Sequence, residues 1–483
     1  SQIYNSFAQI SLPRAPKRPA YGNPTQELDW KRFLADSLCD FQREQVEILR
    51  EVKPEWWITH NGVFGNIDHW KLSGDLDFYG VDVYQGFVGD KPEGFAWGAL
   101  KNESCRYVSG GYIIPEQLGG AGGQRDYMLP TPEKGLMRLW AYQGIARGAD
   151  GVLHFRWRTC RYGAEIFWNG ILDHDNKPRR RYKEFCQEGR ELAALSDRIV
   201  GSVLEVKIGL LNNYDQDAVY STMPNGFPGP SDQIADIYNE MLKQNLPVGM
   251  LETHDSFESM DILFLTTHIV EDPVLAEKLD AFVKQGGLLI VTARSFSRNS
   301  NNHVLTETAP GLLTKIVGTT REEEGRIIHD LEYKIENNGH TLTAFGGYEI
   351  LNPTSAEVLA NWNIREGKGH LHPAHGLPAI TVNRNGKGKA VYIGTYLNSG
   401  NISDLLEQLL PLKPVSRQAY AHRYVESSLR HRDDERTLYL LNHTYESQPV
   451  SFTGSGTELI TGNKHSQTIT LEPLGVAVLA LEN

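Results

Sequence analysis

The segment "YVSGGYIIPEQ" (residues 107–117) is followed by "EKGLMRLWAYQGIARG" (133–148) and then by "GADGVLHFRWR" (148–158). The first and third runs are short and apolar and end in polar side chains, whereas the middle run has apolar residues at helical spacing. A strand, a helix and a second strand in this order are typical of a parallel α/β sheet or barrel. Catalytic side chains of such folds lie at the carboxyl ends of the strands, so we expect the chemistry there.

The same alternation begins earlier in the chain. The run "LDWKRFLADSLCDFQREQVEILREVKP" (28–54) has apolar residues at helical spacing and stops at a proline, which predicts a long amphipathic helix. The runs "EWWITHN" (55–61) and "LDFYGVDVY" (76–84) are short and apolar and end in polar residues, which predicts two more strands. Residues 1–200 are therefore expected to form a barrel-type α/β domain.

Two further domains are expected beyond residue 200. The run "DPVLAEKLDAFVKQGGLLIVTAR" (272–294) predicts a helix, a Gly-Gly turn and a strand, as in a second parallel α/β sheet. After Pro411 and Pro414 the apolar runs are short, separated by polar turns and without helical spacing. We therefore expect an α/β domain over 201–415 and a small β-sandwich over 416–483.

Composition excludes several classes of protein. The 483 residues carry a formal net charge of −12, which disfavours binding to a nucleic acid. Only four cysteines occur, without a CxxC pair, so neither a disulfide framework nor a clustered zinc site is expected. No run of eighteen apolar residues is present, so no membrane span is expected. We expect a protein of the cytoplasm without a metal or cofactor.

Glu116 is the first candidate for chemistry. It follows Ile113 and Ile114 at the end of a predicted strand, which would hold its carboxylate at a sheet edge. Gln117 beside it can donate hydrogen bonds, and the glycines of "LGGAGG" (118–123) would let a ligand approach the backbone. Taken alone, the same residue could be an ordinary exposed glutamate at a strand end.

A second group of candidates follows the strand that ends near residue 158. The run "HFRWRTCRYGAEIFW" (154–168) contains Arg156, Trp157, Glu165 and Trp168. Aromatic planes stack on the apolar faces of sugar rings, and Arg and Glu bind sugar hydroxyls, so this clustering indicates a polyol site. Separate structural roles for each residue are the alternative. Two other strand ends fit a sugar-binding barrel, with His60 and Asn61 at one and Asp82 and Tyr84 at the other.

At these residues the sequence resembles the β-galactosidases of glycoside hydrolase family 42. The resemblance rests on five runs in the same order and spacing: "ITHN" (58–61), "DLDFYGVDVY" (75–84), "PEQ" (115–117), "GLMRLWAYQGIARGADGVLHFRWR" (135–158) and "GAEIFW" (163–168). It implies a (β/α)8 barrel, then an α/β trimerisation domain and a small β domain. It also implies a retaining exo-glycosidase that acts on terminal β-D-galactosyl residues, with Glu116 as nucleophile and with Asn61, Tyr84, Gln124, Trp157, Glu165 and Trp168 in the sugar pocket.

A retaining glycosidase needs a second carboxylic acid about 5–5.5 Å from the nucleophile. In the family this acid follows the fourth strand, and the resemblance places its position upstream of Ser1. On this interpretation residues 1–200 hold strands five to eight of the barrel, and the acid/base and the family's zinc cluster lie elsewhere. We expect this chain alone to be inactive, or to act with a chain that carries the missing half. Glu165 and Asp82 are the internal alternatives for the second acid.

Two departures from the family concern the sugar. Trp168 stands where the family usually has a histidine, and Gln124 stands where it usually has a tryptophan. The resemblance therefore implies galactose or a related sugar such as an arabinopyranoside, a fucoside or a modified galactoside.

The second domain resembles class I glutamine amidotransferases, which need a cysteine nucleophile. No cysteine follows Cys186, so a structural role is expected, and the family implies a homotrimer. From a different class, the rival hypothesis is a non-catalytic carbohydrate-binding or assembly protein.

Overall fold

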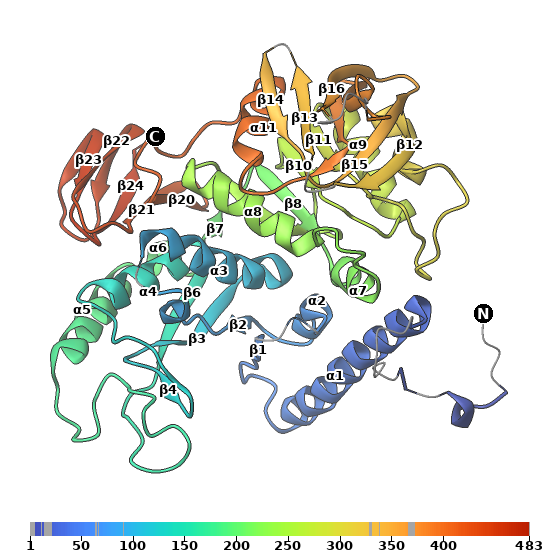
Figure 1. The fold of residues 1–483 in the computed structure, drawn as a ribbon. Coiled ribbons are helices and arrows are strands. Elements are labelled where there is room, and N and C mark those ends of the chain that lie inside the picture. The colour runs from blue at the N-terminus through green and yellow to red at the C-terminus, as the bar shows by residue number, and fades with distance from the viewer. Residues whose placement is uncertain are drawn as a thin grey trace.

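The computed structural model describes residues 5–10, 12–13, 22–62, 65, 67–89, 91–327, 331–337, 339–365 and 372–482. Three units follow one another along the chain: a barrel-type unit coloured blue to green, a large mixed-sheet unit in green to orange, and a β unit in red (Figure 1). Within the described ranges, no helix has both the length and the apolar character needed to cross a membrane.

The first unit is built on a four-stranded parallel sheet in the order β1-β2-β3-β6. Helices α3 and α4 lie against these strands, as a β/α barrel requires. The strands of the sheet are β1 (Asn61–Gly62), β2 (Tyr79–Val81), β3 (Tyr112–Leu118) and β6 (Ala149–Phe155), and β4 (Gly123–Gln124) and β5 (Tyr127–Met128) form a hairpin. The helices are α1 (Pro24–Val52), α2 (His69–Ser73), α3 (Phe95–Ser109), α4 (Leu136–Ala146), α5 (Arg180–Ala194) and α6 (Ser196–Ile199), with short 3-10 turns η1 (Phe7–Gln9), η2 (Gln85–Val88) and η3 (Pro92–Gly94).

The expected elements of this unit are present, with two differences. Helix α1 begins at Pro24, capped by the Asn23 side chain, and ends two residues before Pro54. The strand predicted from residue 107 begins only at Tyr112, because residues 107–109 complete helix α3, which ends at Gly110 with φ +75°. The strand predicted over 55–61 is reduced to Asn61–Gly62.

The second unit is a nine-stranded mixed sheet in the order β14-β13-β16-β17-β18-β11-β10-β8-β9. Its parallel part, β9-β8-β10-β11-β18, has the doubly wound order of flavodoxin-like folds, in agreement with the expected parallel α/β sheet. The elements of this unit are β8 (Ile208–Asn212), α7 (Tyr214–Thr222), α8 (Pro230–Lys243), β9 (Val248–Glu252), β10 (Ile262–Leu265), α9 (Pro273–Gln285), β11 (Leu288–Thr292), η4 (Gly311–Leu313), α10 (Thr314–Val317), β12 (Thr319–Arg326), β13 (Glu332–Asn337), β14 (His340–Thr343), β15 (Phe345–Pro353), β16 (Glu357–Arg365), β17 (Pro378–Asn385), β18 (Gly388–Ile393), β19 (Thr395–Tyr396), α11 (Ile402–Leu409) and η5 (Leu410–Leu412).

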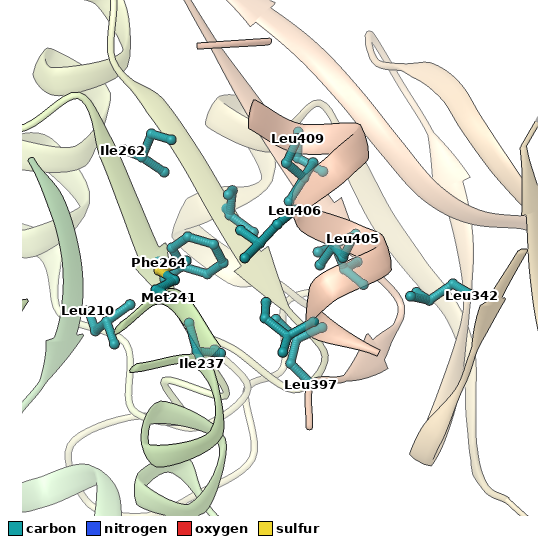
Figure 2. Close-up of a cluster of buried hydrophobic side chains, with 14 of the residues drawn as sticks. Leu210, Ile237, Met241, Ile262, Phe264, Leu342, Leu397, Leu405, Leu406 and Leu409 are labelled. Carbon is teal, nitrogen blue, oxygen red and sulfur yellow. The ribbon is translucent and has the colours of Figure 1, made fainter. Parts of the chain in front are cut away.

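Helices α8 and α11 bury their apolar faces on this sheet. Leu406 of α11 points toward Phe264 of β10, and Leu405 and Leu409 belong to the same buried cluster (Figure 2). The spacing of these leucines is the three- and four-residue repeat of one helix face, so the sequence pattern alone accounts for the packing.

The third unit is one six-stranded antiparallel sheet in the order β23-β22-β24-β21-β20-β7. The expected sandwich of two sheets is therefore wrong. Both faces of this sheet are buried, since Leu438 and Leu440 pack within the unit whereas Tyr439 and Leu441 pack with the first unit. Its strands are β7 (Val203–Leu204), β20 (Val425–Arg432), β21 (Glu435–Asn442), β22 (Gln448–Glu458), β23 (Lys464–Leu471) and β24 (Val476–Leu481).

Candidate active site

Glu116 lies in β3 at an irregularity of the sheet. The register between β3 and β6 shifts between Ile114 and Gln117, and Pro115 stands at this break without an N–H to donate. Irregularities of this kind change the direction of a side chain near the end of a strand. The Glu116 carbonyl still accepts a hydrogen bond from Val83 N at 2.9 Å, so the backbone stays fixed where the carboxylate emerges.

Tyr84 and Trp168 form the wall beside Glu116. The Tyr84 hydroxyl donates to Glu116 Oε2 at 2.5 Å. Burial, followed by this bond and the charge of Glu116, raises the pKa of Tyr84 far above its usual value, so Tyr84 remains a donor. The Trp168 ring stands edge-on to Tyr84 with centroids 5.3 Å apart and is only 6% exposed. The structure thus brings together three residues that the sequence singled out.

Asp82 is a second carboxyl group in the electrostatic reach of Glu116. Asn61 Nδ2 donates to Asp82 Oδ2 at 2.7 Å, while Asp82 Oδ1 is buried and has no hydrogen-bond partner. Burial and the negative charge of Glu116 raise the pKa of Asp82 to about 6. The Asn61 side chain is therefore bonded to Asp82. The neighbouring His60 ring contacts the Asn61 carbonyl oxygen at 2.8 Å.

Glu165 lies in a neighbouring cleft and is paired with Arg156. The cleft has a volume of about 470 Å³ and is lined by Gln124, Arg125, Arg156, Cys160, Tyr162, Gly163, Ala164 and Glu165. Arg156 forms an ion pair with one Glu165 oxygen, and Gln124 Nε2 lies 3.5 Å from the other. Two positions that sequence reasoning linked to sugar binding therefore share one cleft.

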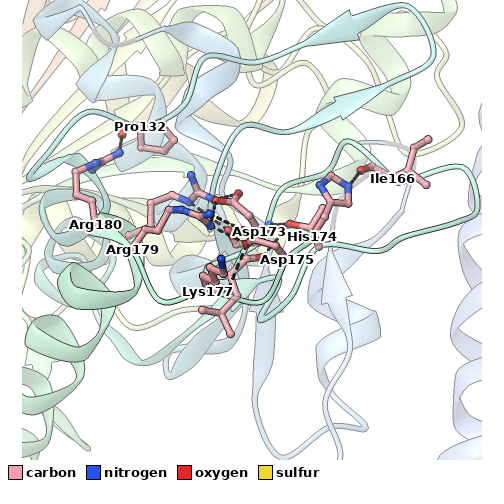
Figure 3. A network of polar contacts seen from close by, with 12 residues as sticks. Pro132, Ile166, Asp173, His174, Asp175, Lys177, Arg179 and Arg180 are labelled. Atoms are coloured by element: carbon pink, nitrogen blue, oxygen red, sulfur yellow. Dashed lines mark hydrogen bonds and ion pairs between the residues drawn. The ribbon is translucent and has the colours of Figure 1, made fainter.

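A polar network holds the segment that follows this cleft. Arg179 donates to both oxygens of Asp175, and His174 Nε2 lies 2.6 Å from the Ile166 carbonyl oxygen (Figure 3). Arg180 donates to the Pro132 carbonyl at 2.6 Å. His174 therefore ties Ile166, which lies between Glu165 and Trp168, to the segment that Arg179 and Asp175 brace.

The glycine-rich segment after Glu116 has a different role from the expected one. A side chain on Gly120 would lie 2.6 Å from Asn169 O, and one on Gly122 would lie 3.0 Å from the Trp168 ring. The glycines therefore make room for the protein's own loop. Gln117 also differs from the expectation, since it is fully buried and donates to the Met137 carbonyl at 3.0 Å.

Trp157 does not join the residues around Glu116. Its ring packs edge-on against Tyr182 and Phe185 of α5, with centroids 5.9 Å and 6.0 Å away, and it is 54% exposed. Trp157 follows Arg156 directly, and neighbouring residues of an extended segment point to opposite sides. Trp157 thus packs on α5 in this structure, and its place in the sugar pocket stays a prediction.

Two aromatic residues of the site were missed by the sequence reasoning. Phe87 in η2 and Tyr127 in β5 lie 5.8 Å apart between ring centroids and contact Tyr84 and Trp168, respectively. They are separated by forty positions in the chain and stand in loops, where no periodicity marks them. The available signal was that each residue is an aromatic side chain shortly after a strand, Phe87 after β2 and Tyr127 after β3.

Among the residues that the structure describes, no group of three or more His, Cys, Asp or Glu side chains is placed to hold a metal ion. A strand-end carboxylate on a barrel-type sheet, set among aromatic rings and an Arg–Glu pair, is typical of glycoside hydrolases. Comparison with known families is specific. Residues 1–195 match the β-galactosidase model of glycoside hydrolase family 42, residues 209–415 match the β-galactosidase trimerisation domain and residues 425–481 match the β-galactosidase C-terminal domain. The chain belongs to this family.

Individual relatives agree with the family assignment. The chain is similar to β-galactosidase BgaA of Clostridium cellulovorans, with 29% identity over 99% of this chain and 72% of the relative. It is similar to β-galactosidase bgaB of Geobacillus kaustophilus, with 32% identity over 92% of this chain and 65% of the relative. The chain thus spans about two thirds of the length of these relatives.

Solved structures share the fold. The β-galactosidase from Bacillus circulans sp. alkalophilus superposes with a TM-score of 0.90 at 22% identity, over 99% of this chain and 72% of that one. The enzyme from Halorubrum lacusprofundi gives 0.82 at 24% identity, over 99% and 71%. Because the catalytic-family match begins at residue 1, the comparisons give no support to the expected absence of half the barrel or to a companion chain.

Proposed function

We propose that this protein is a retaining exo-β-galactosidase that hydrolyses terminal, non-reducing β-D-galactosyl residues with Glu116 as nucleophile. The observation that carries the proposal is the Glu116 carboxylate at the end of β3, where it accepts a hydrogen bond from Tyr84 at 2.5 Å. A hydrogen bond donated to a carboxylate holds it in one orientation.

The mechanism follows from these groups. The Glu116 carboxylate attacks the anomeric carbon, a carbon–oxygen bond forms, and the bond to the leaving oxygen breaks as a second acid gives that oxygen a proton. The same acid, now a base, takes a proton from water, which attacks the anomeric carbon and releases both the sugar and Glu116. Two inversions give overall retention.

The second acid is best sought outside the four described barrel strands. Asp82 accepts from Asn61 and Glu165 is paired with Arg156, so each has a partner of its own. The outward face of α1 carries the exposed apolar residues Phe33, Phe41, Ile48 and Val52, which further barrel elements would cover. We propose that such elements complete the barrel and supply the acid/base.

The proposed sugar pocket has Trp168 and Gln124 where the family usually has a histidine and a tryptophan. Trp168 fills the wall beside Tyr84, and Gln124 lies next to Glu165. A ring in place of a hydrogen-bonding imidazole would change recognition at one hydroxyl, so a related sugar such as an arabinopyranoside or fucoside is included in the proposal.

Residues 209–415 favour a homotrimer, whose mass can be measured by mass photometry. The four cysteines are free, as suits the proposed cytoplasmic location.

Dinitrophenyl β-galactoside tests the nucleophile directly. Its leaving group departs without protonation, so release of dinitrophenol depends on Glu116 and not on the acid/base. We expect a burst of dinitrophenol from the wild-type protein and its loss in Glu116→Gln. Glu133→Gln, the same change at an exposed glutamate, is the matched control.

The rival hypothesis of a non-catalytic sugar-binding or assembly protein gives a different result. It predicts galactose binding without any dinitrophenol burst. An undiminished burst in Glu116→Gln would remove the proposed nucleophile.

A further inference from the structure

Four aromatic rings form a closed cluster that leads from Glu116 to the protein surface. Tyr84 contacts Trp168 and Phe87 at centroid distances of 5.3 Å and 6.3 Å, and Tyr127 contacts Phe87 and Trp168 at 5.8 Å and 6.3 Å. Three of these four contacts are edge-on, with interplanar angles of 83° to 90°. Such pairs hold one another in fixed orientations.

The cluster has an inner and an outer half. Trp168 is buried, and Tyr84 bonds Glu116 through its hydroxyl, so these rings belong to the wall already described. Phe87 and Tyr127 are 53% and 43% exposed, and Met128 next to them is 58% exposed. Large apolar side chains gathered at the surface next to a catalytic carboxylate indicate a surface that a ligand covers.

We propose that Phe87 and Tyr127 form a platform that binds the second sugar of the substrate, the unit that leaves when Glu116 attacks the terminal galactose. This inference rests on the proposed function, because it assigns the second sugar of the same substrate. An exo-acting site holds the terminal sugar near Glu116, so the rings on the solvent side of the cluster contact the next unit. The C–H face of a pyranose matches such rings, whereas its hydroxyls stay in water.

The backbone gives the platform a fixed position. Phe87 lies in the 3-10 turn directly after Tyr84, and Tyr127 lies in the hairpin whose other strand carries Gln124. Leu129 N donates to Gly122 O at 2.6 Å, which ties the hairpin to the glycine segment after Glu116. Rigid rings lose little conformational entropy when a sugar binds, so the platform adds affinity at low cost.

Calorimetric binding distinguishes this role without relying on hydrolysis. Two ligands are compared: galactose, and a sulfur-linked β-galactosyl disaccharide that the enzyme does not cleave. We expect Phe87→Ala and Tyr127→Ala each to weaken the disaccharide by roughly three- to tenfold and to leave galactose within about twofold. Trp57→Ala is the control, because Trp57 is equally aromatic, 83% exposed and placed before β1, at the opposite end of the strands.

Other outcomes overturn the proposal. Equal loss for both ligands would assign the rings to the galactose pocket or to the fold, and no loss would remove them from binding. A change in particle mass by mass photometry would make them a subunit contact. Failure of the hydrolase proposal appears separately, as the absence of dinitrophenol release from the wild-type protein.

Discussion

At the scale of single residues, the Glu116 carboxylate depends on one hydroxyl group. Tyr84 donates to it at 2.5 Å, and the same tyrosine ring packs on Trp168. A hydrogen bond to a charged group contributes about 1.5–3 kcal/mol, more than a bond between neutral partners. Tyr84 therefore orients the proposed nucleophile through a contact that Phe cannot make.

Tyr84→Phe tests this contact. Because the ring and its packing stay while the donor is lost, we expect kcat/KM for dinitrophenyl β-galactoside to fall by roughly 10- to 100-fold. Circular dichroism should show an unchanged fold. Tyr420→Phe, at a 64% exposed tyrosine in the connection to the third unit, should keep wild-type activity. Equal activity of both variants would contradict the role of the Tyr84 hydroxyl.

A second residue gives the fold a pH dependence. Burial raises the pKa of Glu252 to about 7, although Thr253 N donates to it at 2.6 Å. The folded pKa exceeds the usual 4.5, so stability from this group is fully present below about pH 4.5 and is lost as the pH rises through 7. The loss amounts to at most about 3 kcal/mol for a shift of this size.

Glu252→Gln keeps the shape and removes the titration. We expect its melting temperature to exceed that of the wild type at pH 8 and the difference to shrink or reverse at pH 5, measured by scanning calorimetry. A difference of the same size at both pH values would show that Glu252 does not titrate in this range.

At the scale of elements, the segment after β3 and the loop after β6 fit each other closely. Gly120 faces the backbone of Asn169, and Asn169 N donates to Ala121 O at 2.8 Å. Glu165 and Trp168 belong to this loop, so the glycines control where two candidate residues stand. The absence of side chains is a packing requirement between two pieces of the protein.

Gly120→Ala tests the fit between these loops. The added carbon would meet Asn169 O at 2.6 Å, and backbone cannot yield as a flexible side chain does. We expect a stability loss of about 1–3 kcal/mol and reduced activity. Gly189→Ala in α5 meets nothing within 4 Å and should be neutral or stabilising by about 0.5–1 kcal/mol. Similar melting temperatures for the two variants would contradict the account.

Much of the fold was predictable because its signals are local. Leu405 and Leu409 repeat at helical spacing and define α11, and the apolar run before Glu116 defines β3. Residues 107–109 were assigned to the following strand, although Gly110 and Gly111 separate them from it, and helix α3 was therefore missed. The six-stranded sheet was expected as two sheets because alternating apolar residues do not say what covers each face.

The site was predictable only in part for a related reason. Glu116 and Tyr84 stand at strand ends, where the sequence pattern places chemistry. The packing of Trp157 against α5 was not predicted, because α5 lies beyond the reach of local patterns. Phe87 and Tyr127 were missed because only the folded chain brings their loops together.

At the scale of the whole molecule, the third unit holds the end of helix α4 in place. Arg430 of β20 is fully buried and donates to carbonyl oxygens of Ile145, Ala149, Ile199 and Ser202. These carbonyls belong to the end of α4, the start of β6, the last residue of α6 and the chain after it. One side chain therefore joins the β unit to the strand that leads to Arg156.

Arg430→Met should loosen this joint. The four carbonyls would lose their donor in a buried place, and we expect a loss of about 3–5 kcal/mol, seen as a lower melting temperature and faster proteolysis of the first unit. Arg436→Met, at an exposed arginine of neighbouring β21, is the control. A melting temperature unchanged by Arg430→Met would contradict the coupling between the units.

The identity of the nucleophile is tested most directly by covalent trapping. A dinitrophenyl β-galactoside with fluorine at C2 has a good leaving group, while the fluorine slows the second step, so the glycosyl-enzyme accumulates. Digestion and mass spectrometry then locate the sugar. The account predicts a label on the peptide that contains Glu116, absent from Glu116→Gln and retained in Glu133→Gln. A label on Asp82, on Glu165 or on any other residue would contradict it.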